Sequence, residues 1–157
     1  MFDPSIKQIE EQTVAFKVMT GSYSQIPQGY GQLYAWVGQH GLQPTGMPQA
    51  VYLTPPDETP ESEAIWELWA PVAPNASEVA ADEQAIGVKR IDAGLVASIM
   101  HRGPYEGIAP DYERLFAWIP GQGCTICGPP REVYYSDPDE VPPEEYLTEI
   151  QVPVFRN

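Results

Sequence analysis

The chain of 157 residues is long enough to bury a hydrophobic core as one domain, and its 18 prolines and 13 glycines favour many short elements over long helices. The net charge of −14, with eight scattered Lys or Arg, disfavours direct binding to nucleic acid and suits a cationic or neutral small partner, although it serves solubility equally well. Because no basic, apolar leader and no window of 18 apolar residues is present, we expect a cytoplasmic protein without a membrane span.

The first half of the chain predicts a β-α-β-β unit. A strand over 13–19 is rich in β-branched and apolar residues and ends at Gly21. A helix follows, because apolar residues recur at the spacing of one helical face. These residues are Ile26, Tyr30, Leu33 and Val37. Strands over 50–53 and 64–70, joined by an acidic, proline-rich turn over 55–61, complete the unit.

The second half of the chain repeats the first. Residues 6–72 align with 88–154 at a constant offset of 82 without a gap, and 24 of the 67 positions are identical. Unrelated sequences would give roughly one identity in 17, so chance does not explain the match. The same elements are therefore predicted again. They are strands over 95–100, 132–135 and 146–152, a helix over 108–119 and an acidic turn over 137–144.

The predicted fold class is α+β, with duplicated β-α-β-β units in a single domain over 1–157. The first repeat covers about 6–72, a linker covers 73–85, and the second repeat covers about 86–155. Neither half has enough surface to cover its own sheet. The two are therefore expected to pack with pseudo-twofold symmetry around a central cleft, with equivalent residues of both halves facing it.

One carboxylate on the last strand of each repeat is the main functional candidate. Strand alternation places Glu67 on one face with Trp69, and Glu149 on one face with Leu147. The ordinary interpretation is a carboxylate exposed to solvent. In an apolar cleft, burial would raise its pKa unless a cationic guest or a hydrogen-bond donor compensates. Such a residue can select a cation with help from aromatic faces, or act as a general base toward water.

Nine tyrosines and four tryptophans give the chain a large aromatic supply. Core packing is the more common role of any single ring, but as a group they predict a flat, apolar cavity wall. Trp69 is favoured over Trp66, since alternation puts the two on opposite faces of the strand. The other rings expected near the seam are Trp36, Trp118, Tyr52, Tyr134 and Tyr135.

Two cysteines and a histidine complete the candidate chemistry. Cys124 and Cys127 have the spacing of half a zinc knuckle or a redox pair. A structural zinc needs four ligands, and the first repeat has Leu42 and Thr45 at these places, so neither a metal nor another cofactor is predicted. Because no nucleophile is predicted beside His101, it is expected to be a surface or partly packed residue.

Several motifs of the second half resemble the GyrI-like domains. These motifs are Arg102-Gly103-Pro104-Tyr105-Glu106-Gly107-Ile108, then Tyr112, Leu115 and Trp118, then Glu132-Val133-Tyr134-Tyr135-Ser136-Asp137-Pro138 and Thr148-Glu149-Ile150-Gln151-Val152-Pro153-Val154. That family includes effector-binding domains of multidrug-responsive transcription activators, gyrase-inhibitor-like proteins, and hydrolases of cyclopropane-containing natural products. The resemblance covers nearly the whole chain. It implies a duplicated β-α-β-β fold with an aromatic-lined pocket for small, often cationic or planar molecules, and Glu149 at its base.

On this resemblance, the chain is expected to bind a hydrophobic, planar or cationic small molecule. The first alternative is an enzyme in which Glu149 is the catalytic residue for hydrolysis of cyclopropane-containing genotoxins, and the second is an inhibitor or regulator that binds a protein such as gyrase. Transcription-factor members carry a helix-turn-helix domain, for which this sequence has no room before Ile6, so no direct relay to DNA is expected. The predicted ligand-binding residues are Glu149, Glu67, Trp69, Tyr134, Tyr52, Trp118, Trp36, Tyr105 and Leu147.

Overall fold

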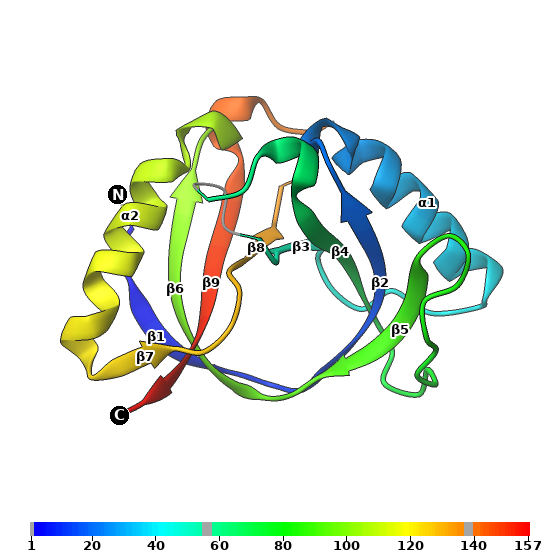
Figure 1. The fold of residues 1–157 in the computed structure, drawn as a ribbon, viewed down its shortest axis with the longest axis horizontal. Coiled ribbons are helices and arrows are strands. Elements are labelled where there is room, and N and C mark those ends of the chain that lie inside the picture. The colour runs from blue at the N-terminus through cyan, green and yellow to red at the C-terminus, as the bar shows by residue number, and fades with distance from the viewer. Residues whose placement is uncertain (1, 55–57, 137–139) are drawn as a thin grey trace. The chain divides into compact units, whose positions relative to one another are not determined.

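The computed structural model of the chain (Figure 1) describes residues 2–54, 58–136 and 140–157. The first three residues of each predicted acidic turn, 55–57 and 137–139, lie outside the described residues. A short 3-10 helix overlaps the end of each turn and extends beyond it, Glu61–Glu63 in the first and Pro143–Glu145 in the second. Neither α-helix within the described stretches has the length and hydrophobicity needed to cross a bilayer.

The chain divides into two compact units, of which unit 2 comprises residues 11–92. Its antiparallel sheet has the strand order β5-β2-β4-β3. The strands are β2 (Gln12–Thr20), β3 (Gln49–Tyr52), β4 (Ile65–Val72) and β5 (Ile86–Ile91). Helix α1 (Ile26–Gln39) follows a 3-10 turn and packs on β2 and β4. The predicted strands and helix are confirmed, whereas β5 is an additional strand.

Unit 1 comprises residues 1–10 and 93–157 and has the matching strand order β1-β6-β9-β8. Its strands are β1 (Ser5–Ile9), β6 (Gly94–Arg102), β7 (Cys124–Ile126), β8 (Arg131–Tyr134) and β9 (Leu147–Arg156), with β7 paired to the end of β9. Helix α2 (Ala109–Trp118) packs on β6 and continues into a 3-10 turn that contains Pro120. Each unit thus combines one sheet with one α-helix, which confirms the α+β class.

The two leading strands are exchanged relative to the sequence repeats. β1 opens the first repeat but pairs with β6 of unit 1, and β5 opens the second repeat but pairs with β2 of unit 2. The β-α-β-β prediction was therefore incomplete, because each sheet has a further strand at its edge. Both strands are short and contain charged residues, so hydrophobic periodicity alone does not reveal them. Through this exchange Lys7 joins the unit of Glu149, and Lys89 joins the unit of Glu67.

The strand registers of the two units coincide at the sequence offset of 82. In unit 2, Val18 and Val51 are the cross-strand partners of Glu67. In unit 1, Met100 and Val133 are the cross-strand partners of Glu149. Each glutamate therefore occupies the same place, on the last strand of its repeat and between two neighbouring strands.

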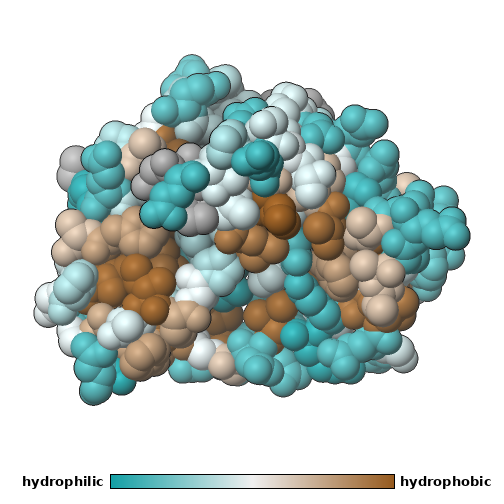
Figure 2. Space-filling model, in the orientation of Figure 1, coloured by the Kyte–Doolittle hydropathy of each residue, from teal (hydrophilic) through white to brown (hydrophobic). Residues whose placement is uncertain are grey.

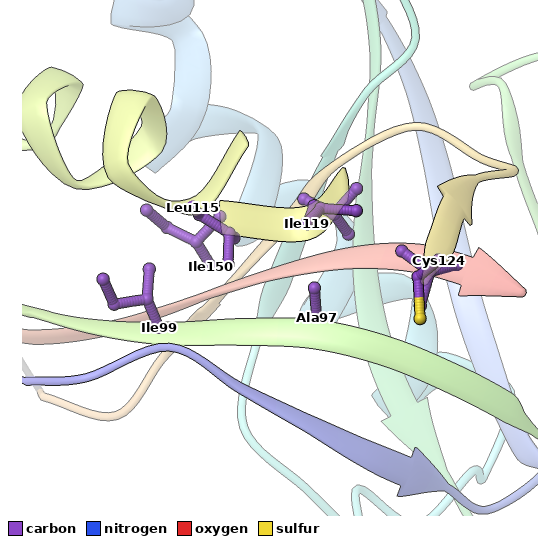
Figure 3. Packing of buried hydrophobic residues seen from close by; sticks show 8 residues of the cluster. Ala97, Ile99, Leu115, Ile119, Cys124 and Ile150 are labelled. Carbon is purple, nitrogen blue, oxygen red and sulfur yellow. The ribbon is translucent and has the colours of Figure 1, made fainter. Parts of the chain in front are cut away.

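The helix side of the unit 1 sheet holds its hydrophobic core. Figure 3 shows Leu115 and Ile119 lying over the strands that carry Ala97, Ile99 and Ile150. Because successive side chains of a strand point to opposite faces, this packing leaves Glu149 and its neighbour at 151 on the other face.

Unit 2 has buried apolar residues on both faces of its sheet. On the helix side α1 approaches closely, because a Cβ added at Gly29 would lie 2.6 Å from Leu68 Cδ1 and 3.0 Å from Met19 Cε. On the other face, a second cluster contains Val14, Phe16, Val51 and Trp69. Glu67 lies on this second face, two residues before Trp69 on the same strand.

Candidate ligand-binding site

Glu149 carries a buried carboxylate that is bound by three donors of its own unit. The residue is only 1% exposed. Ser98 Oγ donates to its Oε2 at 2.5 Å, and Tyr135 Oη donates to its Oε1 at 2.7 Å. The ammonium group of Lys7, from β1, forms an ion pair with Oε2. Both carboxylate oxygens therefore already accept hydrogen bonds within the protein.

These donors determine the ionisation of Glu149. Burial by itself would raise the pKa of Glu149, but hydrogen bonds from Lys7, Ser98 and Tyr135, together with the charge of Lys7, more than offset it and hold the pKa below its ordinary value. The carboxylate is therefore ionised at neutral pH. Burial, the hydrogen bond to Glu149 and the nearby negative charge raise the pKa of Tyr135, so its hydroxyl remains a donor.

Two further polar side chains lie on the same face as Glu149. Arg131 on β8 is the cross-strand partner of Gln151, and its Nε donates to Gln151 Oε1 at 3.0 Å. Burial lowers the pKa of Arg131, while the charge of Glu149 acts in the opposite direction. This face of unit 1 therefore combines a carboxylate with two cationic groups, Arg131 and Lys7.

Glu67 is held by the equivalent lysine in a more apolar setting. Lys89 Nζ donates to Glu67 Oε1 at 2.6 Å, and Trp69 Nε1 donates to the same oxygen at 2.9 Å. The ammonium group also lies 4.6 Å from the centre of the Phe16 ring and 5.5 Å from that of Trp69. A carboxylate together with two ring faces attracts a cation, and here the cation is the Lys89 ammonium.

A separate aromatic cluster lies on the helix side of unit 1. Tyr112 and Tyr134 donate to the two oxygens of the buried Glu132 at 2.5 and 2.9 Å. The Tyr105 ring contacts Tyr134 edge-on at 5.7 Å and stacks on Tyr146 at 5.1 Å. Burial, followed by the influence of Tyr146 and Glu132, raises the pKa of Tyr105, which keeps its hydroxyl neutral.

The buried hydroxyl of Thr148 lies on the same helix-side face. Thr148 is the cross-strand partner of both Tyr134 and His101, so the three side chains form a row across β8, β9 and β6. Its Oγ1 has no hydrogen-bond partner among the described residues. Such an orphaned buried group is uncommon in folded proteins.

The structure divides the predicted binding residues among four places. On the faces directed away from the helices, it brings Glu149 together with Leu147 in unit 1, and Glu67 together with Trp69 in unit 2. On the helix sides, it brings Tyr105 together with Tyr134, while Trp118 packs against the α2 core. The last two, Tyr52 and Trp36, lie on the helix side of unit 2.

Neither of these last two residues contacts Glu67 through a described interaction. Tyr52 contacts the Tyr23 ring edge-on at 5.6 Å. Trp36 is buried, stacks on His40 at 3.8 Å, and donates from Nε1 to Asp82 Oδ2 at 2.9 Å. Their role in ligand binding stays a prediction.

The sequence reasoning did not select the residues that bind the two glutamates most directly. Lys7 aligns with Lys89 in the repeat match, just as Glu67 aligns with Glu149. The match could therefore have pointed to the two lysines. Ser98 carries no such signal, because the first repeat has Phe16 there. Its role follows from the cross-strand register, which places it beside Glu149.

The remaining sequence candidates lie apart from Glu149. His101 is buried, with Nδ1 2.7 Å from Asp111 Oδ2 and Nε2 2.9 Å from the Pro104 carbonyl oxygen. Cys124 is in β7 and Cys127 directly follows it; three extended residues span roughly 10 Å, too far for a disulfide between them. Among the described residues, no three His, Cys, Asp or Glu side chains are grouped so as to hold a metal ion.

Hydrophobic residues also reach the surface of unit 1 beside α2 and β7 (Figure 2). Phe116, Ile126 and Phe155 are the large exposed apolar side chains of α2, β7 and the end of β9. Single exposed apolar residues are normal for folded proteins. These three add nothing to the chemistry around Glu149.

A family model described as the GyrI-like small molecule binding domain matches residues 2–154. The chain belongs to the GyrI-like family. It is also 31% identical over 139 residues to DNA gyrase inhibitor 1 of Dickeya dadantii (strain 3937), a match that covers 86% of this chain and 89% of that relative.

Several solved structures share the fold. The EcmrR C-terminal domain has a TM-score of 0.78 at 24% identity, covering 100% of this chain and 99% of that one. In the cryo-EM structure of an EcmrR–DNA complex the TM-score is 0.83 at 24% identity, and the match covers 99% of this GyrI-like chain but 58% of the EcmrR chain.

Two more distant structures are similar over most of their length. A hydrolase from Listeria innocua has a TM-score of 0.70 at 16% identity, covering 97% of this chain and 91% of that one. SAV2435 bound to tetraphenylphosphonium has a TM-score of 0.57 at 16% identity, covering 98% and 94%. At these identities the likeness concerns the fold alone.

Proposed function

We propose that this GyrI-like domain binds a hydrophobic, planar or cationic small molecule, with Glu149 as its polar anchor. The observation that carries the proposal is the buried, ionised carboxylate of Glu149 in a chain that belongs to a small-molecule-binding family. Burying a charge costs free energy, and an apolar side chain of similar size would avoid that cost. A role in recognition accounts for a carboxylate at this place.

The charge of Glu149 favours a ligand that is itself cationic. Away from bulk water, opposite charges attract more strongly than they do at an exposed surface. Leu147, on the same face, and the ring of Tyr135 would contact the apolar body of such a ligand. We further propose that the chain is a duplication, in which Glu67, beside the Trp69 ring, is the counterpart of Glu149 in the first repeat.

The rings on the helix side of unit 1 supply a second kind of contact. Tyr105 is 38% exposed and stacks on Tyr146, so part of its ring is accessible to a planar molecule. Tyr134 contacts its edge. We assign stacking on a planar molecule to Tyr105 and Tyr134 on the helix side, and charge recognition to Glu149 on the opposite face, so the two are separate places of contact.

Titration with tetraphenylphosphonium, a hydrophobic cation, tests this function. Binding would be followed by tryptophan fluorescence and by calorimetry at low ionic strength. We expect Glu149→Gln to weaken binding at least about tenfold, equivalent to about 1.4 kcal/mol, because the anchoring charge is lost. Glu113→Gln is the matched control, since it removes one exposed carboxylate from α2. If a panel of hydrophobic cations leaves both signals of the wild-type protein unchanged, the proposal fails.

A second candidate function is inhibition of DNA gyrase through direct contact. It is favoured by the 31% identity to DNA gyrase inhibitor 1 and is compatible with the net charge of −14. We expect the protein to reduce the supercoiling activity of purified gyrase in a concentration-dependent manner. A pull-down that recovers no gyrase, together with unchanged supercoiling at saturating protein, would exclude this role.

Hydrolysis of cyclopropane-containing genotoxins ranks below binding. A water molecule activated by Glu149 would need one carboxylate oxygen, and both oxygens already accept hydrogen bonds. The lowered pKa also makes Glu149 a weaker base. Product formation that Glu149→Gln abolishes would reverse this ranking, whereas stoichiometric protection of the compound without product would support binding.

A further inference from the structure

The carboxylate of Glu149 already binds a cationic group that belongs to the chain itself. The Lys7 ammonium pairs with Oε2, the oxygen that also accepts from Ser98. We propose that Lys7 is an internal competitor, so that a cationic ligand binds Glu149 only by displacing the Lys7 ammonium. This inference rests on the proposed function and adds a residue that controls affinity and selectivity at the same site.

Lys7 is, with Tyr135, one of the two partly exposed donors to Glu149, and it is the one that pairs with Oε2. Its side chain is 43% exposed, whereas that of Glu149 is 2% exposed and Ser98 is buried. It projects from β1, the outermost strand of the unit 1 sheet. A lysine has a flexible four-carbon stem, and its ammonium group regains full hydration when it swings into water. Releasing Lys7 therefore costs less than releasing the buried hydroxyl of Ser98.

Lys7 is also the partly exposed member of its ion pair with Glu149. Glu149 is almost completely buried while the side chain paired with it is partly exposed. A cationic ligand that pairs with Oε2 is therefore expected to compete with the Lys7 ammonium for this oxygen. Small inorganic cations gain little from this exchange because they lose hydration, whereas a lipophilic cation also buries apolar surface.

The equivalent lysine of unit 2 is held more firmly. Lys89 pairs with Glu67 and lies over the Phe16 and Trp69 rings. In unit 1, the position equivalent to Phe16 is occupied by Ser98. Cation–π attraction adds to the ion pair only in unit 2 among the described contacts. Exchange by a ligand is therefore expected at Glu149 and not at Glu67.

Internal competition lowers the apparent affinity of a cationic ligand. The intrinsic affinity is multiplied by the fraction of protein molecules in which Lys7 does not pair with the Glu149 carboxylate. Removing the lysine charge should therefore raise the affinity for the cation. Removing a residue that contacts the ligand directly would instead lower that affinity. A neutral ligand of similar shape gains nothing electrostatic from the change.

The test compares Lys7→Met with wild-type protein, using tetraphenylphosphonium and neutral triphenylphosphine oxide as probes. Methionine keeps much of the apolar stem without the charge. We expect Lys7→Met to bind the cation about tenfold or more tightly, to bind the neutral probe unchanged, and to lose the gain when Glu149→Gln is added. Lys17→Met is the matched control, because Lys17 lies on β2 and its ammonium bonds the Gln84 carbonyl.

A measurement on the wild-type protein covers the case in which Lys7→Met does not fold. In a ¹⁵N-labelled sample, the Lys7 ammonium protons are expected to lose protection from exchange as the cation saturates the site. Unchanged Lys7 signals at saturation, or equal or weaker cation binding by a folded Lys7→Met, would overturn the inference and leave the proposed function intact. If neither wild-type protein nor Lys7→Met binds the cation, cation binding itself fails and the inference falls with it.

Discussion

The two units present the same lysine–glutamate pair in opposite surroundings. In unit 2 the pair lies beside Phe16 and Trp69. At the matched positions unit 1 has Ser98 and Gln151, which hydrogen-bond to Glu149 and Arg131. The lysine–glutamate pair is common to both units, whereas its neighbours are not. The polar neighbours in unit 1 distinguish the candidate site.

The helix sides of the two units also differ in polarity, with unit 1 again the more polar. In unit 2, Met19 and Leu68 pack within contact distance of Gly29 on α1. In unit 1, His101 and Asp111 occupy the positions of Met19 and Gly29, and His101 Nδ1 lies within hydrogen-bond distance of Asp111 Oδ2, at 2.7 Å. The same helix–sheet packing is therefore built from apolar contacts in unit 2 and from polar contacts in unit 1.

The largest expected effect comes from removing the charge of each glutamate in turn. Glu149→Gln should lower the free energy of unfolding by about 3 kcal/mol, because three donors lose their charged acceptor in a buried place. Glu67→Gln should cost about 1 kcal/mol, since its side chain is more exposed and the Lys89 ammonium keeps its contacts with the rings. Urea denaturation of both variants measures the difference.

Glu113→Gln serves as the control for a change of net charge and should leave stability nearly unchanged. Equal losses in Glu149→Gln and Glu67→Gln would contradict the distinction drawn between the two pairs.

A smaller effect on stability is expected when Gly87 of β5 and its counterpart Ser5 of β1 are each replaced by the residue found at the other position. A Cβ at Gly87 on β5 would lie 2.3 Å from the Val79 carbonyl oxygen, because residues 79–81 cross this strand. Ser5 on β1 is its counterpart at the offset of 82 and is exposed. We expect Gly87→Ser to cost about 2 kcal/mol through overpacking. Thermal unfolding measures it, and Ser5→Gly should change the midpoint far less; the reverse order would contradict the close crossing.

The smallest expected effect is a difference in acid sensitivity. The pKa of Glu149 in the folded protein lies below its ordinary value of 4.5, so its contribution to stability is fully present above about pH 4.5 and is lost as pH falls through the folded-state pKa. The stability difference between wild-type protein and Glu149→Gln should therefore narrow with acidification in this range. Denaturation at several pH values measures it; a constant difference from pH 6 to pH 3 would contradict the assignment.

Much of the fold could be predicted because its signals are local. The apolar stripe from Ile26 to Val37 predicted α1, and strand alternation predicted that Glu149 and Ile150 lie on opposite faces. The strands β1 and β5 lack a strong periodic signal, and their partners are distant in sequence. The cleft expected at the seam of the repeats stays a prediction.

The candidate site was less predictable than the fold. Glu149 was selected from its strand position and its motif, but its buried partners depend on long-range register. Lys7 is separated from Glu149 by most of the chain, so no local pattern links the two. A cationic ligand was expected to pair with the Glu149 carboxylate. In the structure the Lys7 ammonium pairs with it, because the exchanged strand β1 brings Lys7 to the carboxylate.

The exchanged leading strands also affect how the chain matures on the ribosome. Ser5 pairs with Ser98, so β1 is made long before its partner strand exists. At a synthesis rate of about 5 to 20 residues per second, β1 waits several seconds, and Lys7 waits longer still for Glu149. During translation β1 is therefore an unpaired β-segment until β6 has been made.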